Sequence, residues 1–132
     1  MRRFGAAHTL NLRGLSTEQT LRAVRDMTDG LGADCVMEVA GAPDLISLGL
    51  KSLRIGGRFI EIGNSVPGAD FRYDACDIVW RRLTLKGVHN YDVRHLQAAV
   101  DLLERAGGRF PFHEIVTHRV RLTEVNEGLR LA

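Results

Sequence analysis

The sequence has little cysteine, proline and tryptophan, and charge of neither sign prevails. Its 132 residues include 2 cysteines, 3 prolines and 1 tryptophan, with a net charge of +2. The thiols of Cys35 and Cys76 lie apart without a Cys-x-x-Cys spacing, which fits a reducing compartment and predicts a cytoplasmic protein. Lysine and arginine are scattered along the chain, so we expect no nucleic-acid partner.

A membrane span, a metal site and a hydrolase nucleophile are also missing from the sequence. No apolar run approaches the roughly 18 to 20 residues that cross a bilayer, which predicts a soluble chain without a membrane partner. His89, His95, His113 and His118 show no paired spacing such as His-x-x-x-His, so we expect no metal ligands. No serine has a Gly-x-Ser-x-Gly context, so nucleophilic hydrolysis is not supported.

Helix and strand patterns alternate along the chain. Ser16 and Gln19 form a capping box, Pro43, Asp74 and Asp92 mark further helix starts, and Thr123 is predicted to cap the last helix. Helices are predicted at 17–29, 43–53, 75–82, 93–108 and 124–132; strands at 9–11, 33–41, 56–63 and 83–88, with an extended segment at 115–120. Such alternation with short loops predicts an α/β fold, a doubly wound parallel sheet in which strand 33–41 is buried.

Five segments in this order resemble the medium-chain, zinc-type alcohol dehydrogenases: "FGAAHTLN", "GADCVMEVAGAP", "LRIGGRFIEIG", "LTLKGV" and "IVTHRVRLTEVNEGLRLA". The resemblance covers nearly the whole chain. It implies that residues 1–110 are part of a Rossmann domain, which binds NAD or NADP, and that residues 111–132 begin the return to a zinc-carrying catalytic domain. Within the family, "GVHNYDVRHLQAAVDLL" resembles the subgroup associated with phosphonate breakdown.

The matched strands correspond to the third to sixth strands of the Rossmann sheet. The first two are absent from this sequence, together with the Gly-x-Gly-x-x-Gly turn, the acidic ribose-binding residue and the family's zinc ligands. "MRRFGAA" resembles the end of the helix that follows the second strand. Because the family's strand order is 3-2-1-4-5-6, the missing strands leave a gap, and residues 8–11 should either move beside strand 33–41 or stay unpaired.

The resemblance also implies where a dinucleotide would bind. In open α/β sheets the ligand lies at the carboxyl ends of the strands, and in this family the loops after the fourth, fifth and sixth strands contact the cofactor largely through backbone groups. The last two loops serve the nicotinamide carboxamide. The candidate cofactor-binding residues are Val39, Ala40, Gly41, Ile62, Gly63, Asn64, Val88, His89 and Asn90.

Some conspicuous side chains have structural explanations. Glu38 lies in a strand expected to be buried, where a carboxylate needs partners, and we expect it to accept hydrogen bonds from backbone amides of a neighbouring turn. Phe71 and Trp80 are expected to pack beneath helix 75–82. We assign no residue of this chain a catalytic role.

Three functions remain open at this point. The first is a portion of an oxidoreductase that transfers hydride between an alcohol or aldehyde and a nicotinamide cofactor, inactive without the missing parts. The second is a binding or dimerisation module, in which the strand from Leu83 to Val88 pairs with its copy in a second subunit. The third is another doubly wound domain, such as a methyltransferase-like fold, against which the segment "THRVRLTEVNEGLRLA" argues.

Overall fold

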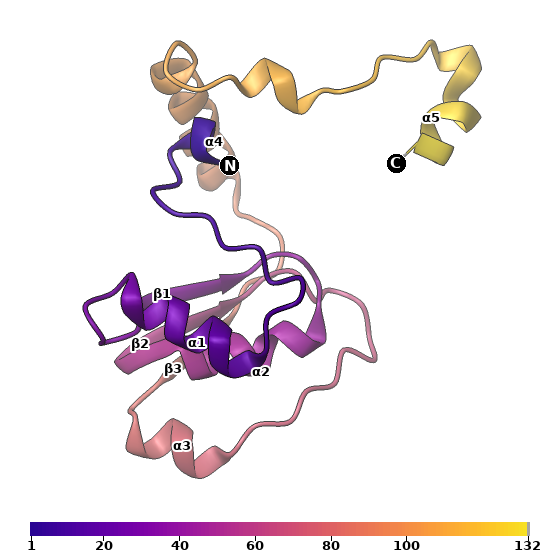
Figure 1. Cartoon of the computed structure of the whole chain (residues 1–132). Helices are drawn as coiled ribbons and strands as arrows, with labels where there is room; N and C mark the ends of the chain where they lie inside the picture. Colours follow the sequence, from indigo (N-terminus) through magenta and orange to yellow (C-terminus); the bar gives the residue numbers. More distant parts are fainter. Residues whose placement is uncertain (132) are drawn as a thin grey trace. The chain divides into compact units, whose positions relative to one another are not determined.

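A computed structural model describes residues 1–131 (Figure 1). The chain forms two compact units, one of residues 11–90 and the other of residues 1–10 with 91 onward. The first unit holds the sheet. The assignment of residues 1–110 to a dinucleotide-binding domain and of 111–132 to a catalytic-domain segment stays a prediction.

A three-stranded parallel sheet forms the centre of the unit of residues 11–90. Its strands are β1 (Ala33–Glu38), β2 (Leu53–Glu61) and β3 (Thr84–Gly87), in the order β1-β2-β3. Both strand pairs are parallel. The predicted α/β fold with a partial, parallel Rossmann-type sheet is therefore confirmed.

Two helices on this unit begin where the sequence predicts. Helix α1 (Thr17–Asp26) starts with the predicted capping box, in which Ser16 and Gln19 exchange side-chain and backbone hydrogen bonds. Helix α2 (Pro43–Ser52) has proline in its first turn, where a missing N–H costs nothing. Helix α2 packs against β1 and β2 and also contacts α1.

The core of this unit is small and lies between α2 and the sheet. Its buried members are Ile46 and Leu50 of α2 with Leu53 and Phe59 of β2. A Cβ at Gly49 would lie 2.7 Å from a ring carbon of Phe59, so the glycine lets the helix approach the sheet closely. The buried apolar side chains of this core therefore come from the central strand and the inner face of α2.

Strand β1 is less buried than predicted. Cys35 and Met37 are exposed, the latter by 63%, and only Glu38 of this strand is fully buried. The apolar run predicts a strand covered on both faces, but β1 is an edge strand of the sheet in residues 1–131, with β2 on one side. The strand prediction is correct and the burial prediction is wrong.

A short helix, α3 (Ala75–Trp80), connects β2 to β3. Asp74 caps it by accepting a hydrogen bond from the backbone N–H of Cys76, as predicted. Trp80, however, is 80% exposed and Phe71 is 46% exposed, so neither packs beneath the helix. These two residues correct the sequence-based expectation, because with one sheet of three strands there is too little apolar surface to cover them.

The unit of residues 1–10 and 91 onward contains helix α4 (Val93–Ala106), helix α5 (Val125–Leu131) and three short 3-10 turns, Arg2–Phe4, Phe112–Ile115 and Leu122–Glu124. The predicted turn at Arg2–Phe4 ends at Gly5, whose φ is +91°. The turn is held by an ion pair between Arg3 and Glu114 and by contact of Phe4 with Phe112. Asp92 caps α4, as predicted.

Three expected features are not present. Residues 9–11 form no strand and stay unpaired, which was one of the two outcomes expected for a third strand without its neighbour. The extended segment predicted at 115–120 forms no strand, and its first residue, Ile115, belongs to the 3-10 turn Phe112–Ile115. Thr123 lies inside a 3-10 turn and does not cap α5; the turn begins after Arg121, whose backbone N–H donates to Glu124. These short segments lack a partner that would pair their backbone groups.

Candidate functional site

The carboxyl ends of the three strands lie at one level. Glu38 of β1 is opposite Glu61 of β2, and Glu61 is opposite Gly87 of β3. The three loops that leave the strands, residues 39–41, 62–64 and 88–90, therefore start side by side at one edge of the sheet. This edge, which we call the carboxyl edge, brings together the nine residues that sequence analysis names as candidates.

Glu38 is a buried carboxylate at the end of β1, with an exposed fraction of 5%. It accepts hydrogen bonds from the backbone N–H groups of Ala40, Gly41 and Ala42, at 2.9, 3.1 and 3.3 Å. Burial raises the pKa of Glu38, but these amide hydrogen bonds outweigh burial and hold the pKa below its usual range. The predicted hydrogen bonds to backbone amides are confirmed, in the turn directly after the strand.

Asn64 joins the ends of β1 and β2. Its Nδ2 donates to Oε2 of Glu38 and to Oε1 of Glu61, both at 3.0 Å, and its backbone N–H also donates to Oε1 of Glu61 at 3.0 Å. The other oxygen of Glu61, Oε2, is buried and has no hydrogen-bond partner among residues 1–131. Sequence analysis missed Glu61. Its position, three residues before Asn64 at a strand end, is visible in the sequence, but its proximity to Glu38 depends on strand register.

Gly41 and Gly63 let the first two loops touch. A Cβ on Gly63 would overlap the backbone nitrogen of Gly41 and the carboxylate of Glu38. Gly41 has a φ of +70°, and a Cβ there would lie 3.0 Å from the carbonyl oxygen of Gly63. Close backbone approach is therefore a requirement at both positions, and glycine alone meets it without displacing the buried carboxylate.

Most backbone N–H groups at the carboxyl edge already have acceptors. Besides the three amides bound to Glu38, those of Ile62 and Gly63 donate to the Glu38 carbonyl, and that of Val88 donates to the Glu61 carbonyl. At the third loop, the side chains of His89 and Asn90 contact each other at 3.0 Å and are exposed. A bound molecule at this edge consequently meets few free backbone donors.

A small cavity of about 250 Å³ adjoins the first two loops. It is lined by Gly41, Pro43, Gly63, Asn64 and residues 65–69. Its position beside the Gly41 and Gly63 contact makes it the concave part of the carboxyl edge.

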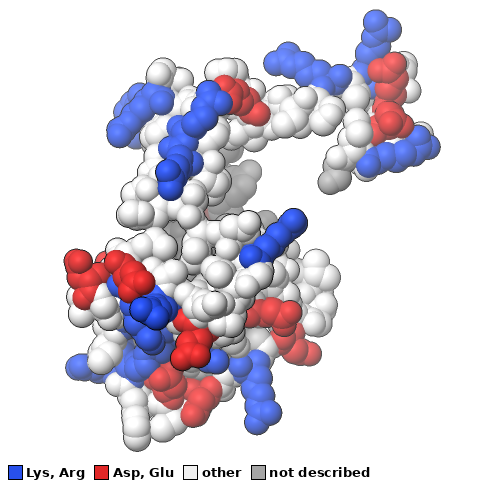
Figure 2. Space-filling view, viewed as in Figure 1, with Lys and Arg blue, Asp and Glu red and all other residues white. Residues whose placement is uncertain are grey.

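Metal-binding and membrane-spanning features are absent from residues 1–131. No group of three or more His, Cys, Asp or Glu side chains there could hold a metal ion, so the described residues do not fit a zinc site. No helix of the described part is both long and apolar enough to cross a bilayer. Lysine and arginine are interspersed with aspartate and glutamate over the face that Figure 2 shows.

The strands are parallel, helices connect them, and loops at their carboxyl ends line a cavity. These are the features of the Rossmann class of α/β proteins. Within that class, residues 1–105 match the family described as zinc-binding dehydrogenase. The chain belongs to this family, and the predicted resemblance is confirmed.

Individual relatives agree with the family assignment. The chain is 34% identical over 115 residues to L-threonine 3-dehydrogenase of Symbiobacterium thermophilum, covering 86% of this chain and 32% of the relative. It is 34% identical over 128 residues to erythritol/L-threitol dehydrogenase of Mycolicibacterium smegmatis, covering 96% of this chain and 33% of the relative. The structure of an alcohol dehydrogenase of Thermotoga maritima superimposes with a TM-score of 0.91 at 31% identity. The match covers 98% of this chain and 35% of that structure's chain. The chain thus spans about a third of the length of these relatives.

Proposed function

We propose that this chain contributes the nicotinamide side of the cofactor site to an NAD- or NADP-dependent dehydrogenase that acts on an alcohol or aldehyde. The nine residues at the carboxyl edge, from Val39 to Asn90, would contact the cofactor. When bound, the cofactor supplies the hydride chemistry. Zinc belongs to the family by its description, but its ligands are not among the described residues of this chain. The membership of the phosphonate-associated subgroup stays a prediction.

This proposal rests on which backbone N–H groups at the carboxyl edge already donate hydrogen bonds. Phosphate groups need free N–H donors or cations, whereas the amides of residues 40–42 are bound to the Glu38 carboxylate. A phosphate at this edge would also lie near that buried negative charge. Ribose hydroxyls and a carboxamide, in contrast, bring their own donors. The carbonyl oxygens of Val39, Ile62 and Val88 accept no backbone hydrogen bond within residues 1–131 and suit such donors.

Saturation-transfer NMR of NAD⁺ with the 132-residue chain tests the proposal. We expect the nicotinamide protons to receive more saturation than the adenine protons. The variant Gly63→Ala, whose Cβ would overlap Gly41 and Glu38, should lose this signal. Gly108→Ala is the matched control, since a Cβ there meets no atom within 4 Å. Equal saturation of both ends of NAD⁺, or an unaffected Gly63→Ala variant, would contradict the proposed edge.

The chain alone is expected to lack dehydrogenase activity. Neither a zinc site nor a Gly-x-Gly-x-x-Gly turn is encoded in its sequence. Zinc-dependent oxidation of alcohols by the purified 132-residue chain would refute this expectation. A cytoplasmic location belongs to the same proposal and rests on the two unpaired thiols, Cys35 and Cys76.

A second proposed role is dimerisation through β3. This strand is an edge of the sheet, and all four of its residues are exposed, with Leu85 at 41%. An exposed edge strand has unpaired backbone groups that a second copy can pair with. Because the N–H of Val88 points toward β2, the alternation along the strand directs the N–H of Leu85 outward.

Sedimentation analysis of two variants tests the dimer. Leu85→Pro removes an outward donor, and should convert a dimer to monomers, while Leu85→Ala keeps the donor and should weaken association less. A wild-type chain that is monomeric at all accessible concentrations would rule out the role.

A further inference from the structure

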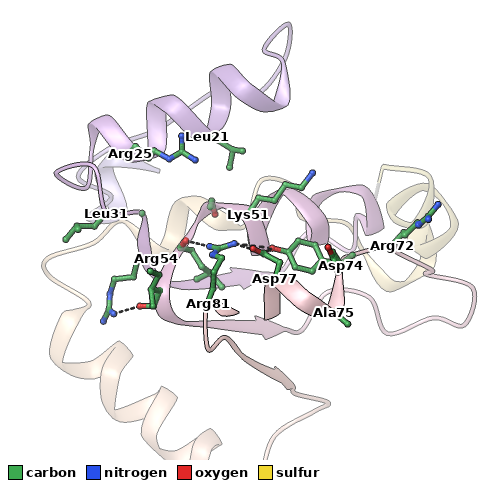
Figure 3. Close-up of a pocket in the computed structure, with 15 residues that line it drawn as sticks. Leu21, Arg25, Leu31, Lys51, Arg54, Arg72, Asp74, Ala75, Asp77 and Arg81 are labelled. Atoms are coloured by element: carbon green, nitrogen blue, oxygen red, sulfur yellow. Dashed lines mark hydrogen bonds and ion pairs between the residues drawn. The ribbon is translucent and has the colours of Figure 1, made fainter. Parts of the chain in front are cut away.

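A larger cavity, of about 910 Å³, lies at the opposite end of the same sheet. Its walls come from α1, the end of α2, the start of β2 and α3 (Figure 3). All of its lining residues belong to the unit of residues 11–90. It shares no residue with the cavity at the carboxyl edge. We call it the amino-end cavity, because Leu53 in its wall begins β2 and is paired with Ala33, the first residue of β1.

A hydrogen-bonded cluster forms one wall of the amino-end cavity. Arg81 donates to Asp77 at 2.8 Å, to the hydroxyl of Tyr73 at 3.1 Å and to the carbonyl of Leu53, and the Tyr73 hydroxyl donates to Asp77. The hydrogen bond from Tyr73, together with Arg81 and the positive charge of Lys51, holds the pKa of Asp77 below its usual range despite burial. The negative charge of Asp77 is therefore satisfied within the protein.

The remaining charge around the amino-end cavity is positive. Five cationic side chains line it against two acidic ones; the cations are Arg25, Lys51, Arg54, Arg72 and Arg81, and the acids are Asp74 and Asp77. Arg54 is paired with Asp34 and Arg81 with Asp77, while Asp74 caps α3. Arg25, Lys51 and Arg72 form no ion pair with any other residue of 1–131.

We propose that the amino-end cavity binds a phosphorylated small molecule, with Arg25 of α1 and Lys51 of α2 contributing positive charge to its wall. Guanidinium groups bind phosphate oxygens in pairs, and a lysine adds a point charge. A concave site with an excess of positive charge concentrates anions. Its volume falls in the range of about 300 to 1,000 Å³ that small-molecule sites occupy. Leu21 lies beside Arg25 in Figure 3 and offers apolar contact to the uncharged part of the ligand.

Isothermal titration calorimetry of the 132-residue chain with inorganic pyrophosphate and, separately, with ADP tests this site. Both probes should bind, and ADP should bind more tightly if apolar contact contributes. The double variant Arg25→Gln/Lys51→Gln should weaken both by at least tenfold. The matched control, Arg22→Gln/Arg58→Gln, removes two exposed cations from α1 and β2 that lie outside the cavity, and should change either affinity less than twofold.

Several results would overturn the proposal. One is that neither probe binds at millimolar concentration. Another is that the cavity variant and the control lose the same affinity, which would indicate attraction by net charge. Circular dichroism checks that the variants are folded, and Arg25→Gln alone replaces the double variant if that one unfolds. Gly63→Ala should leave pyrophosphate binding unchanged, so this site and the proposed nicotinamide edge can fail independently of each other.

Discussion

The two ends of the sheet stabilise a carboxylate in different ways. At the carboxyl edge, the buried Glu38 accepts three backbone amides and the Asn64 side chain. At the amino-end cavity, the half-buried Asp77 is bound by the side chains of Tyr73 and Arg81. Both carboxyl groups have a lowered pKa. Backbone donors are present whatever the sequence, so the first arrangement depends on chain geometry, and the second depends on the identity of its partners.

Removal of the Glu38 carboxylate should have the largest effect. Glu38→Ala leaves three backbone amides without their buried acceptor, and it removes one of the two acceptors of the Asn64 side-chain amide. We expect a loss of about 3 kcal/mol in the free energy of unfolding, measured by urea denaturation. Asp34→Ala on the same strand, whose side chain is 80% exposed, should cost less than about 1 kcal/mol. Equal losses in the two variants would show that the Glu38 hydrogen bonds do not stabilise the edge.

A methyl group between the first two loops should have the next largest effect. In Gly63→Ala the new Cβ overlaps Gly41 and Glu38, and the loops must separate. The expected loss is about 2 kcal/mol, by the same denaturation measurement. Gly108→Ala, with open space at its Cβ, should be neutral within about 0.5 kcal/mol. A Gly63→Ala variant as stable as the control would mean that the close approach of the loops is not required.

Acid should weaken the carboxyl edge. Since the pKa of Glu38 is lower in the folded chain than its ordinary value of 4.5, its contribution is complete above that value and is lost as the pH falls below it. Denaturation midpoints measured from neutral to acidic pH should therefore decline, and Glu38→Gln should decline less. An identical acid profile for Glu38→Gln would assign the sensitivity to other carboxylates.

Alkali should weaken the amino-end cluster. Burial, followed by the hydrogen bond to Asp77, raises the pKa of Tyr73 from 10.0 to about 12. The folded chain thus holds this proton more tightly, and the stability that it provides is present below pH 10 and lost as the pH rises toward 12. The melting temperature should fall over this interval, and Tyr73→Phe should reduce the fall. Tyr91→Phe, at an exposed position, is the control, and its melting temperature should fall as much as that of the unchanged chain.

Glu61→Gln should have the smallest effect. Oε1 of Glu61 keeps both Asn64 hydrogen bonds in the amide, and Oε2 has no partner to lose among residues 1–131. We expect the free energy of unfolding to change by less than about 0.5 kcal/mol. A loss close to that of Glu38→Ala would show that the charge of Glu61, rather than its acceptor oxygen, holds the two strand ends together.

Sequence patterns predicted the starts of α1, α2, α3 and α4 correctly because helix starts depend on residues a few positions apart. The order of the strands, in contrast, was implied by the resemblance to the family. Ser16 with Gln19, and Asp74 with Cys76, form their caps within three residues. The acceptor role of Glu38 was also predicted, since its donors follow within four residues. The same reasoning failed for Trp80, because its exposure depends on what covers α3, and α3 has little beside it in this chain.

Patterns along the sequence predicted the class of fold, and the resemblance to the family implied the edge at which a ligand is expected. The tertiary structure decided what that edge contains. The hydrogen bond from Asn64 to Glu38 joins residues 26 positions apart, and the contact of Gly41 with Gly63 also crosses from one strand end to the next. The amino-end cavity likewise draws its charges from four separate elements. Such features arise from strand register and helix packing, which bring distant residues together, and no local pattern encodes the distances involved.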